Sequence, residues 1–264
     1  MKKPCCTSKK IFEEAGIDNI SKTSRNRFLK TIGKQRRPIK KVLLTPRHKK
    51  LRYNWALRYM KTNMEAVIFT DETRVCLDGP DNWSKGWVEN NSSPPVKIKR
   101  QQGGGGIMIW AGIIDNELIG PVRIKEGVKI NSISYCELLK NNFFPWIKSK
   151  NEDLSKRFIF MHDNAPSHAS KHTKSFLEKN KIFGENLMIW PPNSPDINPI
   201  ENFWGILKRK LYENNQKYAT KDELWSAIVK FCNKIDKKTI KSLTSSVDNR
   251  LITLIQNKGN YINK

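Results

Sequence analysis

The chain has 264 residues, of which 38% are hydrophobic, enough to fill a substantial core. Its 49 Lys and Arg against 25 Asp and Glu give a formal net charge of +24, which indicates an anionic partner, nucleic acid first of all. The sequence argues against a membrane protein, a disulfide scaffold and a zinc knuckle, because no apolar run reaches the roughly 18 residues of a spanning helix and the five cysteines include no C-x-x-C pair. We therefore expect a reduced, globular, intracellular protein with no membrane partner.

Positive charge is concentrated near the N-terminus. Residues 1–61 hold 19 basic and 3 acidic residues, a net charge of +16, whereas residues 62–264 hold 30 and 22, a net charge of +8. Within residues 1–45, two short helical patterns stop at Gly16 and Gly33, which predicts a small all-α helix-turn-helix segment.

The second of these patterns has the composition of a helix that reads DNA. Its apolar residues can face inward: Phe28, Leu29 and Ile32. The residues expected to contact bases and phosphates are Arg25, Asn26, Arg27 and Lys30. A Pro-containing run then extends the charge along a DNA backbone or minor groove, through Arg36, Arg37, Lys40 and Lys41. A solvated basic helix and a nuclear localisation signal remain open as alternatives.

A basic helix at 46–62 is expected to link this segment to a body at 63–264. The body begins with two apolar runs, "EAVIFTD" and "RFIFMHD", which predict buried strands that end at Asp71 and Asp163. Two strands and a helix over about 132–149 are expected between them. After them come another helix over roughly 166–179, the strand "ENLMIW", a proline-rich loop and a helical tail. This order predicts a mixed α/β domain.

The helix after the proline-rich loop has one acid, Glu201, in its first turn. Its apolar stripe is expected to face the core: Ile200, Phe203, Trp204, Leu207 and Leu211. Asn198 followed by Pro199 and then Glu201 is also an ordinary helix-start signature. Glu201 taken alone therefore does not indicate chemistry.

Three carboxylates at two strand ends and a helix start would repel one another unless a cation lay among them. Divalent ions with oxygen ligands meet that need and serve phosphodiester chemistry. Considered one at a time, Asp71 would be an acid in a turn and Asp163 the cap of a helix. Their joint occurrence on a basic protein favours phosphoryl transfer. Glu72 is expected to point away from Asp71 if the strand continues.

The segments "FTDE", "HDNAPSH" and "WPPNSPDINPIENFWGILKRKL" resemble the acidic motifs of mariner-superfamily DDE transposases whose third acid is Glu. "GGGGIMIWAGI" and "RRPIKKVLLTPRHKKLRYNWA" extend the resemblance over most of the chain. It implies a ribonuclease-H-like catalytic domain with a clamp loop near 79–102. It also implies that Asp71, Asp163 and Glu201 are catalytic metal ligands, supported by Asn164 and His168. Two departures are the 37 residues between Asp163 and Glu201 and an N-terminal segment shorter than the family's paired head.

The resemblance further implies cut-and-paste chemistry on double-stranded DNA. Water hydrolyses phosphodiesters at transposon ends with Mg²⁺ or Mn²⁺, as two ions, and the freed 3′-OH attacks target DNA, at TA. A homodimer in the DNA complex, nuclear localisation in a eukaryote and no small-molecule cofactor are expected. Two alternatives remain open: a non-cutting DNA-binding protein derived from a transposase, as a domesticated or decaying copy, and a ribonuclease H or an integrase of another lineage.

Overall fold

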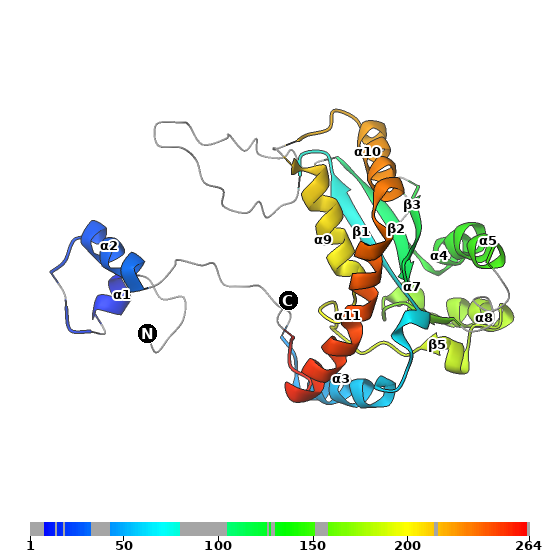
Figure 1. The fold of residues 1–264 in the computed structure, drawn as a ribbon, viewed down its shortest axis with the longest axis horizontal. Helices are drawn as coiled ribbons and strands as arrows, with labels where there is room; N and C mark the ends of the chain where they lie inside the picture. The colour runs from blue at the N-terminus through cyan, green and yellow to red at the C-terminus, as the bar shows by residue number, and fades with distance from the viewer. Residues whose placement is uncertain are drawn as a thin grey trace. The chain divides into compact units, whose positions relative to one another are not determined.

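The computed structural model describes residues 8–13, 15–17, 19–32, 43–79, 105–125, 127, 130–150, 158–213 and 216–262. The chain divides into two compact units, Met1–Leu43 and Leu44–Lys264 (Figure 1). No helix in the described ranges has the length and apolar character needed to cross a bilayer. The expected clamp loop, apart from Gly79, lies outside the described residues, and so do four residues expected to bind DNA: Arg36, Arg37, Lys40 and Lys41.

The described residues of the smaller unit form the helices α1 (Ser8–Glu13) and α2 (Lys22–Ile32). Phe12 and Phe28 contact each other edge to face, with ring centroids 5.9 Å apart. The expectation that Phe28 faces inward is nevertheless wrong, because its side chain is 56% exposed.

The larger unit is built on a mixed five-stranded sheet with the order β3-β2-β1-β4-β5 (Figure 1). Its strands are β1 (Val67–Cys76), β2 (Gly106–Ile114), β3 (Glu117–Arg123), β4 (Ile159–Met161) and β5 (Leu187–Met188). β1 pairs antiparallel with β2 and parallel with β4, and β3 and β5 extend the two sides. The central strand therefore joins an antiparallel half to a parallel half.

β1 is longer than the sequence predicts. We expected it to end at Asp71, but its pairing with β2 continues to Cys76. The pairing with β4 stops at Phe69, so from Thr70 to Cys76 the strand that pairs with β1 is β2. Asp71 therefore lies inside an antiparallel ladder, two residues past the parallel one.

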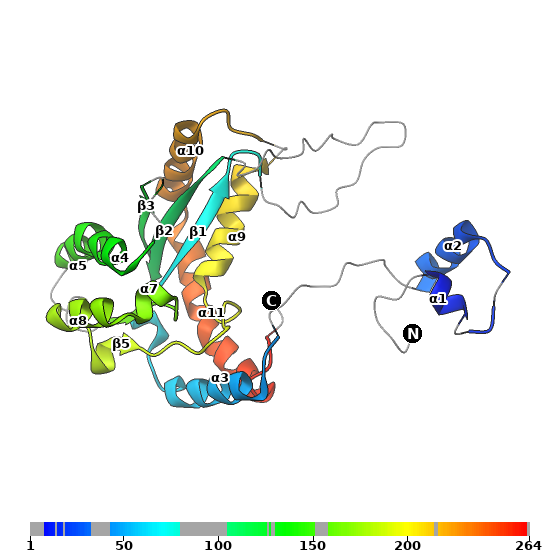
Figure 2. The ribbon, with the colours of Figure 1, turned by 180° about the vertical axis from the view of Figure 1, so that it is seen from behind.

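Helices cover both faces of the sheet (Figures 1 and 2). Val67 and Phe69 of β1 belong to one apolar cluster and Ile68 to another, as strand alternation requires. The Val67 face packs against α9 (Ile200–Leu211), α10 (Lys221–Lys234) and α11 (Lys237–Gln256). The Ile68 face packs against α4 (Ser132–Leu138), a π-helical turn (Leu139–Phe143), α5 (Phe144–Lys148) and α8 (Lys171–Lys179).

Two expected helices form with breaks. The helix expected over 132–149 contains the π-helical turn between α4 and α5. The helix expected over 166–179 is interrupted at Ser170, which separates α7 (Pro166–Ala169) from α8. The Ser170 hydroxyl caps α8 by accepting the N–H of Thr173.

The helix expected at 46–62 forms as α3 (Pro46–Tyr59), which lies in the larger unit. It packs along α11 and buries three side chains, Arg52, Trp55 and Ala56. The Trp55 ring meets Trp190 edge to face at 4.9 Å between centroids. α3 is thereby tied to the start of the proline-rich loop.

Candidate active site

Asp71 lies on the face of β1 that α9 covers. Trp204 of α9 donates its indole N–H to Asp71 Oδ2 over 3.0 Å. Burial, and then the charges of Glu201 and Glu72, raise the pKa of the Asp71 carboxyl to about 7. The ionised form of Asp71 is thus disfavoured unless a cation lies beside it.

Glu201 occupies the first turn of α9. The predicted apolar stripe of this helix is buried throughout: Ile200, Phe203, Trp204, Leu207 and Leu211. Two side-chain bonds align α9 with β1, from Trp204 to Asp71 at 3.0 Å and from Lys208 Nζ to Thr73 Oγ1 at 2.7 Å. Because α9 runs beside β1, the charge of Glu201 acts on Asp71. Glu201 and Asp71 are therefore close enough for their charges to interact.

Asp163 follows β4, the parallel neighbour of β1. Its Oδ1 accepts the Ala165 N–H at 2.8 Å and lies 2.7 Å from His168 Nδ1. Burial alone would raise the pKa of Asp163, but the hydrogen bonds from His168 and from the Ala165 backbone outweigh it and lower the pKa. Both contacts use Oδ1, so Oδ2 is the oxygen on the far side of the carboxylate from His168.

His168 connects Asp163 to Glu72, a residue expected only to point away from Asp71. His168 is 3% exposed, and its Nε2 lies 3.5 Å from Glu72 Oε1, an ion pair longer than a good hydrogen bond. Burial lowers the pKa of His168, but the hydrogen bond to Asp163 and the negative charges of Glu72 and Asp163 outweigh burial and raise the pKa to about 9. The imidazolium is therefore held between two carboxylates.

Two aromatic groups back this imidazolium. The His162 ring stacks on His168, with centroids 5.0 Å apart and planes 6° apart. Tyr135 Oη lies 3.1 Å from His162 Nδ1. Burial and the His168 charge lower the pKa of His162 to about 3, so His162 is neutral. The sequence signal for this cluster is the strand alternation that sends Glu72 to the α4 side of β1.

The charge of Glu201 acts on Asp71 on the α9 side of β1, while Asp163 is held by His168. In the part of the chain that the structure describes, no group of three or more His, Cys, Asp or Glu is placed to hold a metal ion. The donor chemistry nevertheless fits a hard divalent cation, because all three side chains offer carboxylate oxygens and Asp71 is destabilised as a lone anion.

The other expected site residues fall into two sets. Asn164 donates its Nδ2 to the Trp190 carbonyl over 2.8 Å, which ties the end of β4 to the start of the proline-rich loop. Asn164 therefore supports the backbone beside Asp163.

The residues expected to contact DNA lie in the smaller unit. Of these, Asn26, Arg27 and Lys30 are exposed on α2 and Arg25 is half-buried.

Comparisons with known proteins place these features in a wider context. Residues 66–225 match the family model described as DDE superfamily endonuclease. The chain is 36% identical over 221 residues to the Tc3 transposase of Caenorhabditis elegans, covering 84% of this chain and 65% of the relative. It is 28% identical over 235 residues to the Tcb1 transposase of Caenorhabditis briggsae, covering 85% and 81%. The chain thus spans just under two thirds of the Tc3 transposase.

Solved structures give a similar fold. The mariner Mos1 paired-end complex with Mg matches with a TM-score of 0.80 and 18% identity, covering 99% of this chain and 77% of that chain. The Mos1 catalytic domain matches with a TM-score of 0.67 and 18% identity, covering 85% and 100%. The mixed sheet with helices on both faces is therefore the expected ribonuclease-H-like fold, and that prediction is confirmed.

Proposed function

Because the chain belongs to the DDE superfamily of endonucleases, in its Tc1/mariner transposase family, we propose that it is a metal-dependent DNA transposase. It hydrolyses phosphodiesters at transposon ends and transfers the freed 3′-OH into target DNA, at TA sites. The observation that carries the proposal is the half-buried Asp71 carboxylate, which accepts a hydrogen bond from Trp204 of α9 and whose pKa is raised by the charge of Glu201. Asp71 lies two residues past the strand pairing that leads to Asp163.

Each carboxylate has a role in this proposal. Asp71, Glu201 and Asp163 hold the divalent ions. When bound, Mg²⁺ or Mn²⁺ lowers the pKa of a water and stabilises the leaving oxygen of the phosphodiester. Trp204 fixes Asp71 through Oδ2, and His168 fixes Asp163 through Oδ1, so that Asp163 offers Oδ2.

The proposed partner is double-stranded DNA, bound by a homodimer. Solved structures of the similar Mos1 transposase include paired-end complexes with a transposon end and complexes with Mn or Mg. The net charge of +24 and the exposed Asn26, Arg27 and Lys30 on α2 support DNA binding by this chain. In a eukaryotic host the protein would act in the nucleus.

The test is a nicking assay on labelled duplexes that carry the inverted repeats flanking the coding sequence. The wild-type protein is expected to nick them with Mn²⁺ or Mg²⁺ and not with a chelator. The variants Asp71→Asn, Asp163→Asn and Glu201→Gln should fall to background and still bind DNA. Asp222→Asn is the matched control, because it removes a charge paired with Arg123 at the surface.

A non-cutting DNA-binding protein is the second candidate function. It is favoured because no group of three or more His, Cys, Asp or Glu among the described residues is placed to hold a metal ion, and because His168 occupies Oδ1 of Asp163. Tight binding to the repeats without nicking at any Mn²⁺ concentration would establish it and refute the transposase. Cleavage of RNA–DNA hybrids in preference to the repeats would instead point to a ribonuclease H.

A further inference from the structure

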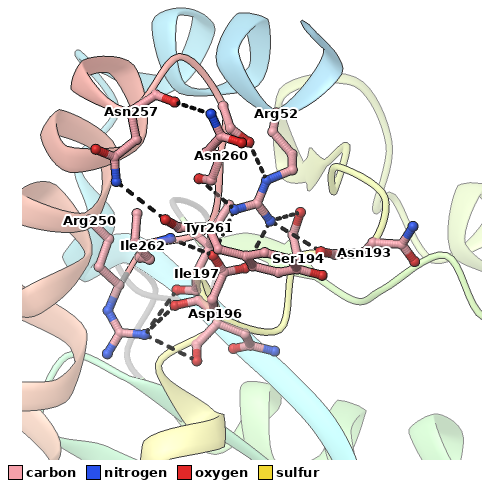
Figure 3. Close-up of polar contacts among 12 residues, drawn as sticks. Arg52, Asn193, Ser194, Asp196, Ile197, Arg250, Asn257, Asn260, Tyr261 and Ile262 are labelled. Carbon is pink, nitrogen blue, oxygen red and sulfur yellow. Dashed lines mark hydrogen bonds and ion pairs between the residues drawn. The ribbon is translucent and has the colours of Figure 1, made fainter. Parts of the chain in front are cut away.

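A buried ion pair joins α3 to the loop that precedes Glu201 (Figure 3). Arg52 is fully buried and binds both oxygens of Asp196, from Nη1 to Oδ1 at 2.8 Å and from Nη2 to Oδ2 at 2.6 Å. The guanidinium also donates to four other oxygens, those of Asn193, Ser194, Gly259 and Asn260. Asp196 is therefore held by a bidentate pair of hydrogen bonds from Arg52, whose guanidinium is itself fixed by its other hydrogen bonds.

The C-terminal segment completes the hold on Asp196. Oδ2 of Asp196 accepts the Ile262 N–H over 3.0 Å. Gly259 brings the segment against α3 with a φ of +76°, and a Cβ there would lie 2.0 Å from the Lys49 carbonyl oxygen. This approach therefore requires glycine. Three segments distant in sequence thus meet at one carboxylate.

Arg250 of α11 also donates hydrogen bonds to the loop that contains Asp196 (Figure 3). Its Nη2 donates to Asn202 Oδ1 over 3.0 Å. Its Nη1 lies 3.2 to 3.3 Å from three successive backbone carbonyl oxygens, those of Asp196, Ile197 and Asn198. These acceptors stand on both sides of Glu201 in the sequence. Arg250 therefore fixes the entry into α9 and its first turn together.

Asn198 carries this restraint to the strand of Asp71. Its Nδ2 donates to the Thr70 carbonyl over 3.4 Å, and its Oδ1 accepts the Ile200 N–H over 3.3 Å. Pro199, at the N-cap position of α9, makes no side-chain cap bond. The direction of the first turn of α9 therefore depends on the loop bonds rather than on a cap.

We propose that Arg52, Asp196 and Arg250, the loop clamp, are positioning residues that aim the Glu201 carboxylate at Asp71. The inference rests on the proposed function, in which Glu201 holds a metal ion. Stability alone is a poor account of the buried pair, because replacing both charges with apolar residues is often neutral or stabilising. What an apolar pair lacks is directional bonding to the loop.

The decisive variant is Arg52→Met/Asp196→Leu. Neither charge is left unpaired, so the protein is expected to fold. Its melting temperature should fall, because the loop and C-terminal oxygens that Arg52 binds lose their donor. The kcat of nicking should fall about 10-fold or more and the half-saturating Mn²⁺ concentration should rise by a similar factor, as for residues that orient metal ligands. KM for the DNA duplex should not change.

Two single variants frame this result. Arg250→Lys keeps the charge but loses the fork, and it should shift kcat and Mn²⁺ dependence in the same direction. Thr244→Val is the matched control, because Thr244 is buried on the same helix but donates to Asp115 in the β2–β3 turn. It should lower the melting temperature without changing the Mn²⁺ dependence.

The outcomes separate the clamp from the function it serves. A folded double variant with wild-type kcat and Mn²⁺ dependence overturns the clamp, as does a Thr244→Val variant that shifts both equally. If the double variant does not fold, the Arg250→Lys variant is the test, and wild-type kcat and Mn²⁺ dependence in that variant overturn the clamp. If the wild-type protein does not nick, Mn²⁺ binding measured by electron paramagnetic resonance decides: weaker binding by the double variant supports the clamp, and equal binding overturns it. Absence of both nicking and Mn²⁺ binding in the wild-type protein refutes the clamp together with the proposed function.

Discussion

The indole of Trp204 donates to Asp71 Oδ2 from one turn beyond Glu201 on the same helix. A single helix therefore supplies one proposed ligand and restrains another. The Trp204 ring also belongs to the core, so the same side chain packs α9 on the sheet and positions Asp71. A substitution that disturbs this packing mildly should weaken metal binding in a protein that is still folded.

Trp204→Phe tests this coupling. The substitution keeps an aromatic ring in the core but removes the indole N–H donor. In the wild-type protein the hydrogen bond from this donor lowers the pKa of Asp71. We expect the pKa of Asp71 to rise further and the half-saturating Mn²⁺ concentration to increase about 10-fold, as is typical for partners of metal ligands. Mn²⁺ titrations of nicking, with circular dichroism as the folding check, would measure it. Unchanged Mn²⁺ dependence in a folded variant would show that the bond is incidental.

Asp71→Asn should stabilise the protein at alkaline pH while abolishing nicking. The pKa of Asp71 is about 7 in the folded protein, against 3.8 for an ordinary Asp carboxyl, so between these pH values the folded state binds a proton that the unfolded state has lost. The free energy of unfolding therefore falls as pH rises from about 4 to 7, and the penalty is complete above pH 7. Its upper bound is about 4 kcal/mol.

Urea unfolding at pH 5 and pH 8 in metal-free buffer would measure this effect. The wild-type protein should lose stability between the two values relative to Asp71→Asn, and Mn²⁺ should restore stability to the wild-type protein alone. Parallel pH profiles for the two proteins would contradict the raised pKa.

Two substitutions of His168 separate its two contacts. In His168→Asn the amide can still donate to Asp163 in place of Nδ1, whereas the longer amide of His168→Gln is better placed to reach Glu72 in place of Nε2. If His168 acts by holding Asp163, the Asn variant should retain more activity, with the Gln variant about 10- to 100-fold below wild type. Initial nicking rates at saturating Mn²⁺ would rank them. The reverse order would assign the main role to Glu72.

The parts of the site that the sequence predicted depend on local pattern. The apolar stripe of α9 follows from helical period alone, and it fixes where Glu201 and Trp204 lie relative to the core. The strand carrying Asp71 follows from an apolar run, but its end does not, because the β2 ladder that carries β1 on to Cys76 is a tertiary pairing.

The parts that the sequence did not predict depend on segments distant in the chain. Glu72 meets His168 across 96 positions, and Arg52 meets Asp196 across 144. No periodicity links such residues, and a charged residue in a basic helix such as α3 is ordinarily solvated. Arg52 is buried because α3 packs against α11, a tertiary contact that local sequence does not indicate.

Exposed residues of α2 should contribute counterion release when the protein binds DNA. Arg27 and Lys30 are exposed, so Arg27→Gln and Lys30→Gln should each reduce the slope of log Kobs against log salt concentration by about 1. Lys22→Gln is the matched control, since Lys22 is exposed at the start of the same helix and lies outside the expected contact set. Fluorescence anisotropy from 50 to 300 mM salt would give the slopes. If all three variants keep the wild-type slope, α2 is a solvated basic helix, and the phosphate contacts must come from another part of this strongly basic chain.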